Sequence, residues 1–313
     1  MSNKSNANGK TTELTAGGLK PLFRFLLFIF LCACPVSPHT YAARKTPEAK
    51  HQTLHTSLRR AIAAALNTTD FKHALVGCLI VRARDRRLIF EQNADTLLMP
   101  ASNMKLLTAA TALDVLGGDF RCRTTVRAQM AIAADGTLAS DLFLVGSGDP
   151  TLTYEDLKKL AQSLWDRGVR KVEGCVVGDE SAFQGAPLGF GWQWDDLPWY
   201  YSMEVSALSL GRNQVNVVVK PGEKVGGAAV VTVEPANGYV VVENAATTGD
   251  EKARNTIAFD RELGGKCIKV RGVIPLGAPP SSQRCSVWQP CLYTATVFAE
   301  MLKAQGIEVR GSP

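Results

Sequence analysis

Hydrophobic positions recur three and four residues apart in four stretches, which predicts helices at residues 54–66, 102–116, 154–168 and 293–306. Between them lie short apolar runs bounded by glycine, proline, asparagine or charged residues. These runs predict strands at residues 74–81, 88–91, 124–132, 142–145, 169–174, 175–179, 215–219, 229–233, 239–243, 267–273 and 307–311, with turns at 226–227 and 247–250. The alternation predicts the α/β (α+β) class.

One unit of this pattern occurs twice. The helix at 154–168 ends in Gly168 before a strand, and the helix at 293–306 ends in Gly306 before another strand. The first copy continues into a further strand, whereas the second reaches Ser312 and Pro313. We therefore expect this chain to stop inside a fold that its relatives complete.

Residues 1–42 have the pattern of an export signal. Four basic residues precede a nine-residue apolar run, and small residues near Ala42 resemble a cleavage site. Because nine apolar residues fall short of the roughly 20 that span a bilayer, we expect cleavage rather than a permanent anchor. Cys34 could instead accept a lipid. The expected location is exported, periplasmic or extracytoplasmic, or lipid-anchored at Cys34.

Composition and charge argue against several classes of function. The 313 residues carry a formal charge of +6, and loss of four basic residues and Glu13 with the leader would lower it by three. This net charge does not indicate a surface that binds nucleic acid or a membrane. We therefore expect membrane contact only through the leader or a lipid on Cys34. Six cysteines remain without a C-x-x-C pair, which disfavours zinc. Cys285 and Cys291 could form a disulfide, or all six could be small buried hydrophobes.

The candidate chemistry is a Ser-x-x-Lys pattern, Ser102 and Lys105, at the start of a helix. Positions three apart share a helix face, so the hydroxyl and the amine lie close together. Serine is a weak nucleophile until a base takes its proton, and a neutral lysine can be that base. No histidine has sequence features of a base. The alternative is a helix-capping serine beside a solvated lysine.

Longer phrases around this pattern resemble a known family. They are residues 100–113, 144–152, 178–183, 195–201 and 206–210. From about residue 55 to its end, the chain is similar to the D-alanyl-D-alanine carboxypeptidase/endopeptidases among the low-molecular-mass penicillin-binding proteins. A β-lactamase would share the Ser-Lys chemistry without explaining the later phrases.

The resemblance implies a penicillin-binding/β-lactamase-like transpeptidase domain that a large α/β region interrupts. Its first part would be residues 43–120, and the inserted domain would be 121–313, with a sub-insertion at about 181–275. Ser102 would be the acylated nucleophile and Lys105 the general base, and the Ser102 N–H would be one oxyanion donor. The implied partners are peptidoglycan stem peptides ending in D-Ala-D-Ala, with β-lactams as covalent inhibitors. No cofactor or metal is expected.

The chain departs from the family in two motifs. It contains no Ser-x-Asn, and its two Lys-Thr pairs are not followed by glycine. We therefore expect this chain to be inactive or nearly so. The rival hypothesis is a binding module that contacts peptidoglycan or a cell-wall partner without catalysis.

Three further features have a structural and a functional interpretation. Asp149 and the Asp195–Asp196 pair could serve acid/base or metal chemistry, but loop-shaping hydrogen bonds are favoured. The aromatic residues could stack on glycan, although packing of the inserted region onto the main domain is favoured; they are Trp192, Trp194, Trp199 and Tyr200. Residues 146–148 are not a phosphate loop, because no G-K-[ST] follows.

Overall fold

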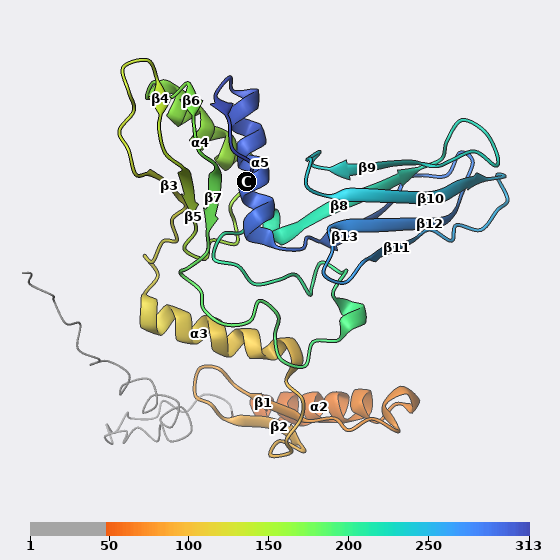
Figure 1. The fold of residues 1–313 in the computed structure, drawn as a ribbon. Helices are drawn as coiled ribbons and strands as arrows, with labels where there is room; N and C mark the ends of the chain where they lie inside the picture. Colours follow the sequence, from red (N-terminus) through yellow and green to blue (C-terminus); the bar gives the residue numbers. More distant parts are fainter. Residues whose placement is uncertain (1–47) are drawn as a thin grey trace, which may run out of the picture. The chain divides into compact units, whose positions relative to one another are not determined.

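The computed structural model describes residues 48–313 (Figure 1). The chain divides into two compact units, one that ends at Leu106 and one that runs from Leu107 to Pro313. The expected leader and the lipid site at Cys34 lie outside the described residues. No helix within 48–313 has the length and apolar character needed to cross a bilayer.

The first unit contains a helix and a hairpin. Its elements are α2 (Glu48–Leu66), β1 (Cys78–Val81), β2 (Leu88–Gln92) and the start of α3 (Met104–Leu116). β1 and β2 pair antiparallel. Their turn closes where Arg82 N–H donates to the Arg87 carbonyl and the Arg82 side chain pairs with Asp85 at 2.7 Å. The predicted helix, turn and hairpin are confirmed, but the first strand begins four residues later than expected.

The second unit begins with an α/β part that has two three-stranded sheets. One sheet has the order β3-β5-β7 and the other β14-β6-β4. The helices α4 (Tyr154–Asp166) and α5 (Pro290–Ala304) contact each other, and α5 also contacts β7. The strands are β3 (Thr125–Ala128), β4 (Thr137–Leu138), β5 (Leu142–Val145), β6 (Lys171–Val172), β7 (Val176–Asp179) and β14 (Glu308–Val309).

The repeated helix-glycine-strand unit is present, and its two copies lie side by side. Gly168 and Gly306 both have φ of +92°, which suits glycine at the end of a helix. After each glycine the chain enters a short strand, and β14 pairs parallel with β6. The same pair of hydrogen bonds ends each helix: the glycine N–H donates three residues back, and the next N–H donates five residues back. Similar sequences have therefore produced the same local structure twice.

The middle of the second unit is rich in β-structure. β8 (Gln214–Lys220) is flanked by β9 (Val230–Glu234) and β13 (Ser281–Ser286). β12 (Cys267–Pro275) is flanked by β10 (Val241–Gly249), which is parallel to it, and by β11 (Ala258–Arg261). In Figure 1 these strands lie together beyond one end of α5.

Several strand predictions were incomplete or wrong. The turn expected at 247–250 is wrong over its first three residues, because β10 continues to Gly249 and stays paired with β12. Residues 129–132 are not a strand, since β3 ends at Ala128. β4, β11 and β13 were missed. β13 has the sequence SSQRCS, in which the pattern of apolar positions is too weak to indicate a strand; main-chain pairing with β8 forms it instead.

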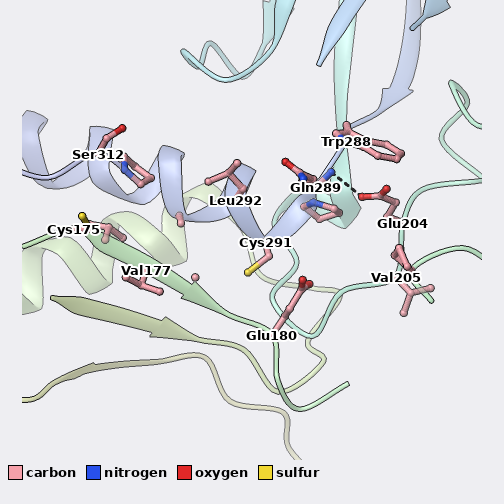
Figure 2. Close-up of a pocket in the computed structure, with 16 residues that line it drawn as sticks. Cys175, Val177, Glu180, Glu204, Val205, Trp288, Gln289, Cys291, Leu292 and Ser312 are labelled. Atoms are coloured by element: carbon pink, nitrogen blue, oxygen red, sulfur yellow. Dashed lines mark hydrogen bonds between the residues drawn. The ribbon is translucent and has the colours of Figure 1, made fainter. Parts of the chain in front are cut away.

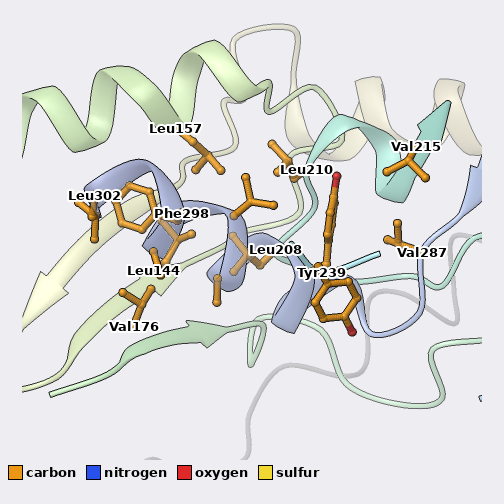
Figure 3. Packing of buried hydrophobic residues seen from close by; sticks show 14 of the residues in the cluster. Leu144, Leu157, Val176, Leu208, Leu210, Val215, Tyr239, Val287, Phe298 and Leu302 are labelled. Carbon is orange, nitrogen blue, oxygen red and sulfur yellow. The ribbon is translucent and has the colours of Figure 1, made fainter. Parts of the chain in front are cut away.

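One hydrophobic cluster connects the two parts of the second unit. It includes Leu144 and Val176 from the strands, Leu157 from α4, Phe298 from α5 and Val215 from β8, each at most 1% exposed (Figure 3). Burial of large apolar side chains is the dominant favourable term in folding, at roughly 25 cal/mol per Å² of apolar surface. The second unit therefore has its own core.

Candidate active site

Ser102 and Lys105 lie within one helical turn of each other. Ser102 is in the short 3₁₀ helix Ala101–Asn103, and Lys105 is in the first turn of α3. The Lys105 Nζ donates a hydrogen bond to Ser102 Oγ at 3.0 Å. The two sequence-predicted site residues are thus brought together, although the serine precedes the α-helix instead of lying inside it.

The backbone before the helix positions the serine. Ala101 has φ of +44°, an uncommon conformation for a residue with a Cβ atom. Asn103 N–H donates to the Pro100 carbonyl at 2.9 Å, which closes the turn. The backbone N–H groups of such a first turn have no acceptor within the helix and point toward the N-terminal end. That end favours negative charge, such as an oxyanion next to Ser102.

The surroundings of this pair are open within the described residues. Ser102 and Lys105 are both exposed, and Leu106 and Leu107 next to them are 71% and 54% exposed. Desolvation is what favours the neutral lysine amine that can act as a base. The geometry supplies proximity and a helix N-terminus. It does not supply an enclosed site.

Asp149 and Asp196 accept hydrogen bonds within their loops, as the sequence favours. Asp149 Oδ1 accepts hydrogen bonds from the N–H and the hydroxyl of Thr151 at 2.9 and 2.6 Å. Asp196 Oδ1 accepts from the Tyr201 hydroxyl at 2.8 Å. Among residues 48–313, no group of three His, Cys, Asp or Glu side chains could hold a metal ion.

The aromatic segment is only partly packed. Trp194 is 71% exposed and Trp192 is 41% exposed, while Trp199 is half-buried. Tyr200 carries the Arg284 guanidinium over its ring, 4.0 Å from the ring centroid. Among the four aromatic residues, Trp199 is therefore the most buried, and Tyr200 has an arginine partner from β13.

The cysteines after the leader are free thiols in the structure. Cys285 is buried and the other five are half-buried, so the disulfide alternative for Cys285 and Cys291 is not observed. Burial raises the pKa of both of these thiols to about 12. Since the thiolate is the nucleophilic form of cysteine, neither thiol is placed for nucleophilic chemistry near neutral pH.

The sequence interpretation missed two buried charges. Glu204 and Arg261 are each 5% exposed. Glu204 accepts a hydrogen bond from Gln289 N–H at 2.7 Å, and Arg261 donates to the carbonyls of Leu197 and Gly265. Burial raises the pKa of Glu204, and it lowers that of Arg261. No sequence signal marks them, because their partners lie up to 85 residues away.

Comparison with known proteins places these features in a family. A model of the D-Ala-D-Ala carboxypeptidase 3 (S13) family matches residues 58–312. A D-alanyl-D-alanine carboxypeptidase of Actinomadura sp. strain R39 is 36% identical over 262 residues, which cover 82% of this chain and 48% of that protein. The D-alanyl-D-alanine carboxypeptidase DacB of Haemophilus influenzae is 25% identical over 254 residues, 79% of this chain and 53% of that protein.

Solved structures agree in fold. Penicillin-binding protein 4 of Haemophilus influenzae superposes with a TM-score of 0.66 at 24% identity, over 75% of this chain and 52% of that one. A second structure of that protein, complexed with a β-lactam, superposes with a TM-score of 0.59 at 22% identity, over 77% of this chain and 51% of that one. The expected penicillin-binding fold with an inserted domain is confirmed. The chain spans about half the length of the relatives it matches, and it belongs to the D-Ala-D-Ala carboxypeptidase 3 (S13) family.

Proposed function

We propose that this chain carries the nucleophile and base of a serine D-Ala-D-Ala carboxypeptidase/endopeptidase. Ser102 attacks the carbonyl carbon between the two D-alanines of a peptidoglycan stem peptide or cross-link. Lys105 takes the hydroxyl proton and returns it to the leaving amine, and water then hydrolyses the acyl-enzyme. The observation that carries the proposal is the 3.0 Å contact between Lys105 Nζ and Ser102 Oγ at a helix start.

Electrostatics support this assignment of roles. The negative oxygen that forms when serine attacks a carbonyl needs hydrogen-bond donors, and the Ser102 N–H lies at the end of a helix that supplies them. β-Lactams react with nucleophilic serines through the same acyl transfer, so Ser102 would be their target as well. The β-lactam complex of the Haemophilus influenzae protein supports this extension to the family.

The domain organisation is part of the proposal. Residues 43–120 would begin the transpeptidase domain and residues 121–313 would form the inserted domain, with a sub-insertion at about 181–275. The β-rich strands β8 to β13 lie between residues 214 and 286, which supports a sub-insertion of this extent. The Ser-x-Asn and Lys-Thr-Gly motifs that this sequence lacks would come from the part of the relatives that the chain does not match. An export signal at residues 1–42 supports an extracytoplasmic location, where peptidoglycan lies.

Labelling with a fluorescent penicillin tests the nucleophile. We expect residues 43–313 to label slowly at Ser102, because the described surroundings of the pair are open. Peptide mass mapping would place the adduct, and Ser102→Ala should abolish it. A chimera with residues 58–312 in place of the matching segment of the Actinomadura protein, 36% identical, would supply the remaining motifs. In that chimera we expect fast labelling and release of D-alanine.

The chimera separates two kinds of failure. Ser102→Ala in the chimera should lose both labelling and D-alanine release, and Lys105→Gln should slow acylation by at least about 100-fold, the lower end of general-base effects. The function would be wrong if a folded chimera neither labels nor releases D-alanine, or if the adduct maps to another residue. If residues 43–313 fold but only the chimera labels, the nucleophile is right and this chain by itself would act through binding.

A further inference from the structure

A cavity of about 650 Å³ lies beside the start of α5, entirely within the second unit (Figure 2). This volume is typical of sites for small ligands or single side chains. The walls are formed by β7, the loop that follows it, the segment around Glu204, the first turns of α5, and Ser312 and Pro313. Val205 N–H donates to the Pro187 carbonyl at 2.8 Å, which fixes two of these segments to each other.

Much of the wall is apolar and accessible. Val205 is 53% exposed and Leu292 is 38% exposed, and Pro187 and the buried Ala295 also line the cavity. Apolar side chains that remain accessible on a concave surface favour a ligand with a hydrocarbon part. This feature excludes a small inorganic cation as the best fit.

The polar groups of the cavity are acidic. Glu204 forms its back, and Figure 2 shows the Glu180 side chain pointing from the loop after β7 toward the start of α5. Glu180 is exposed, and both glutamates line this one cavity. Within residues 48–313, no lysine, arginine or histidine lines the cavity.

The Glu204 carboxylate retains capacity to bind. Oε2 accepts from Gln289 N–H, and within residues 48–313 the structure gives Oε1 no hydrogen-bond donor. Arg261 acts electrostatically on Glu204, but its two terminal nitrogens already donate to the carbonyls of Leu197 and Gly265. Glu204 as a residue is 5% exposed, and a buried carboxylate with one hydrogen bond is costly unless a further donor or a cation completes it.

We infer that this cavity binds an aliphatic primary ammonium group, such as the side chain of lysine or of another diamino acid. The ammonium lies between Glu180 and Glu204, and its methylene stem lies against Val205 and Leu292. An ammonium offers three donors to the two carboxylates, while the stem covers the apolar wall. The site is separate from Ser102 and does not depend on the acylation chemistry.

Two matched peptides test the inference directly. Nα-acetyl-lysine methylamide carries the ammonium, and Nα-acetyl-norleucine methylamide has an uncharged side chain of similar length. Binding to residues 43–313 would be measured by calorimetry and by NMR chemical shifts at neutral pH. We expect the lysine peptide to bind at least about tenfold more tightly, since hydrogen bonds to charged groups contribute about that much or more.

Three variants locate the site. Glu180→Gln and Glu204→Gln should each weaken binding of the lysine peptide about tenfold, while Glu251→Gln, a change at another exposed glutamate, should leave it unchanged. Leu292→Trp should weaken both peptides, because the indole occupies the apolar side of the cavity. Thermal unfolding would show whether each variant is folded.

The inference fails in three distinguishable ways. Equal affinity of the two peptides would show a purely apolar site. Unchanged binding in a folded Glu180→Gln variant would place the ammonium elsewhere. Absence of binding by either peptide to the folded protein at about 10 mM would show that the cavity accepts no such ligand. None of these results changes the penicillin labelling of Ser102, which tests the proposed function by itself.

Discussion

The helices α3 and α5 are both apolar and similar in length, 13 and 15 residues, but their surroundings differ. Eight residues of α5 are buried, because α4 and β7 pack against it. In α3 no residue is buried, and Leu113 and Leu116 are 64% and 51% exposed. Apolar composition alone therefore does not create a core: opposing elements must cover it. Stability is expected to come from α5 and its neighbours.

This difference bears on the chemistry of Ser102. The serine lies at the start of the helix that the described residues leave uncovered. Burial of a lysine amine favours its neutral form, which is the form that can accept a proton. Any element that covers the apolar side chains of α3 would also remove water from the region of Lys105. Packing of α3 and activation of Ser102 are therefore expected to depend on the same contacts.

Two substitutions that shorten an apolar side chain, one in each helix, test this difference most directly. Phe298 in α5 is fully buried, and Leu113 in α3 is 64% exposed. Phe298→Ala should lower the free energy of unfolding by about 3 to 5 kcal/mol through lost burial and a residual cavity. Leu113→Ala should change it by less than about 0.5 kcal/mol. Urea unfolding followed by circular dichroism measures both values.

A cost above about 2 kcal/mol for Leu113→Ala would contradict the contrast. It would mean that α3 is covered in solution. Leu113→Met, which retains an apolar side chain of similar volume, is the control for local effects of substitution.

The two helix-ending glycines give a finer comparison. Gly168 and Gly306 share φ of +92°, so alanine at either position takes a strained conformation that costs roughly 1 to 2 kcal/mol. An added Cβ at Gly168 meets nothing within 4 Å, whereas one at Gly306 lies 3.2 Å from the Trp165 ring. Gly306→Ala should therefore destabilise more than Gly168→Ala. Equal losses in thermal or urea unfolding would show that the ring moves aside freely.

The local structure around these glycines could be predicted from sequence because it depends on near neighbours. The pattern of a helix, a glycine and a strand is repeated at Gly168 and Gly306, and the structure reproduces it in both places. The Ser102–Lys105 pair was predictable for the same reason, since three residues on a helical turn bring two side chains together. Spacing along one segment was sufficient in each case.

Features that depend on distant partners were not predictable. β13 forms because its backbone pairs with β8, about 65 residues earlier in the chain, although its polar sequence does not indicate a strand. Glu204 reads as an ordinary surface glutamate until Gln289 and Arg261 are placed next to it. The cavity of the second unit belongs to this class, since its walls come from segments more than 100 residues apart.

Glu204, which accepts a hydrogen bond at the start of α5, should make the stability of the folded protein depend on pH. Burial raises the pKa of this carboxyl above its ordinary value of 4.5, so the folded protein holds the proton more tightly than the unfolded chain does. Stability from this group is fully present below the ordinary value and is lost as pH rises through the folded value. Each unit of difference corresponds to about 1.4 kcal/mol.

Glu204→Gln removes this titration. Across the window from about pH 4 upward, the free energy of unfolding of the wild type should fall relative to that of Glu204→Gln. Urea unfolding at a series of pH values measures the difference between the two curves. Parallel curves would show that Glu204 is solvated, and that its contact with Gln289 does not require burial.

The smallest expected effect concerns Ser102 itself. Its side chain is exposed and receives one hydrogen bond, from the Lys105 amine, at the start of a helix without buried residues. Ser102→Ala should therefore change the free energy of unfolding by less than about 0.5 kcal/mol, and the chimera variant should melt within about 2 °C of its parent. Loss of penicillin labelling with unchanged melting would assign the loss to chemistry. A variant that melts much earlier would instead show that the hydroxyl holds the turn at Ala101, and the structural alternative of a helix-capping serine would then be preferred to the nucleophile.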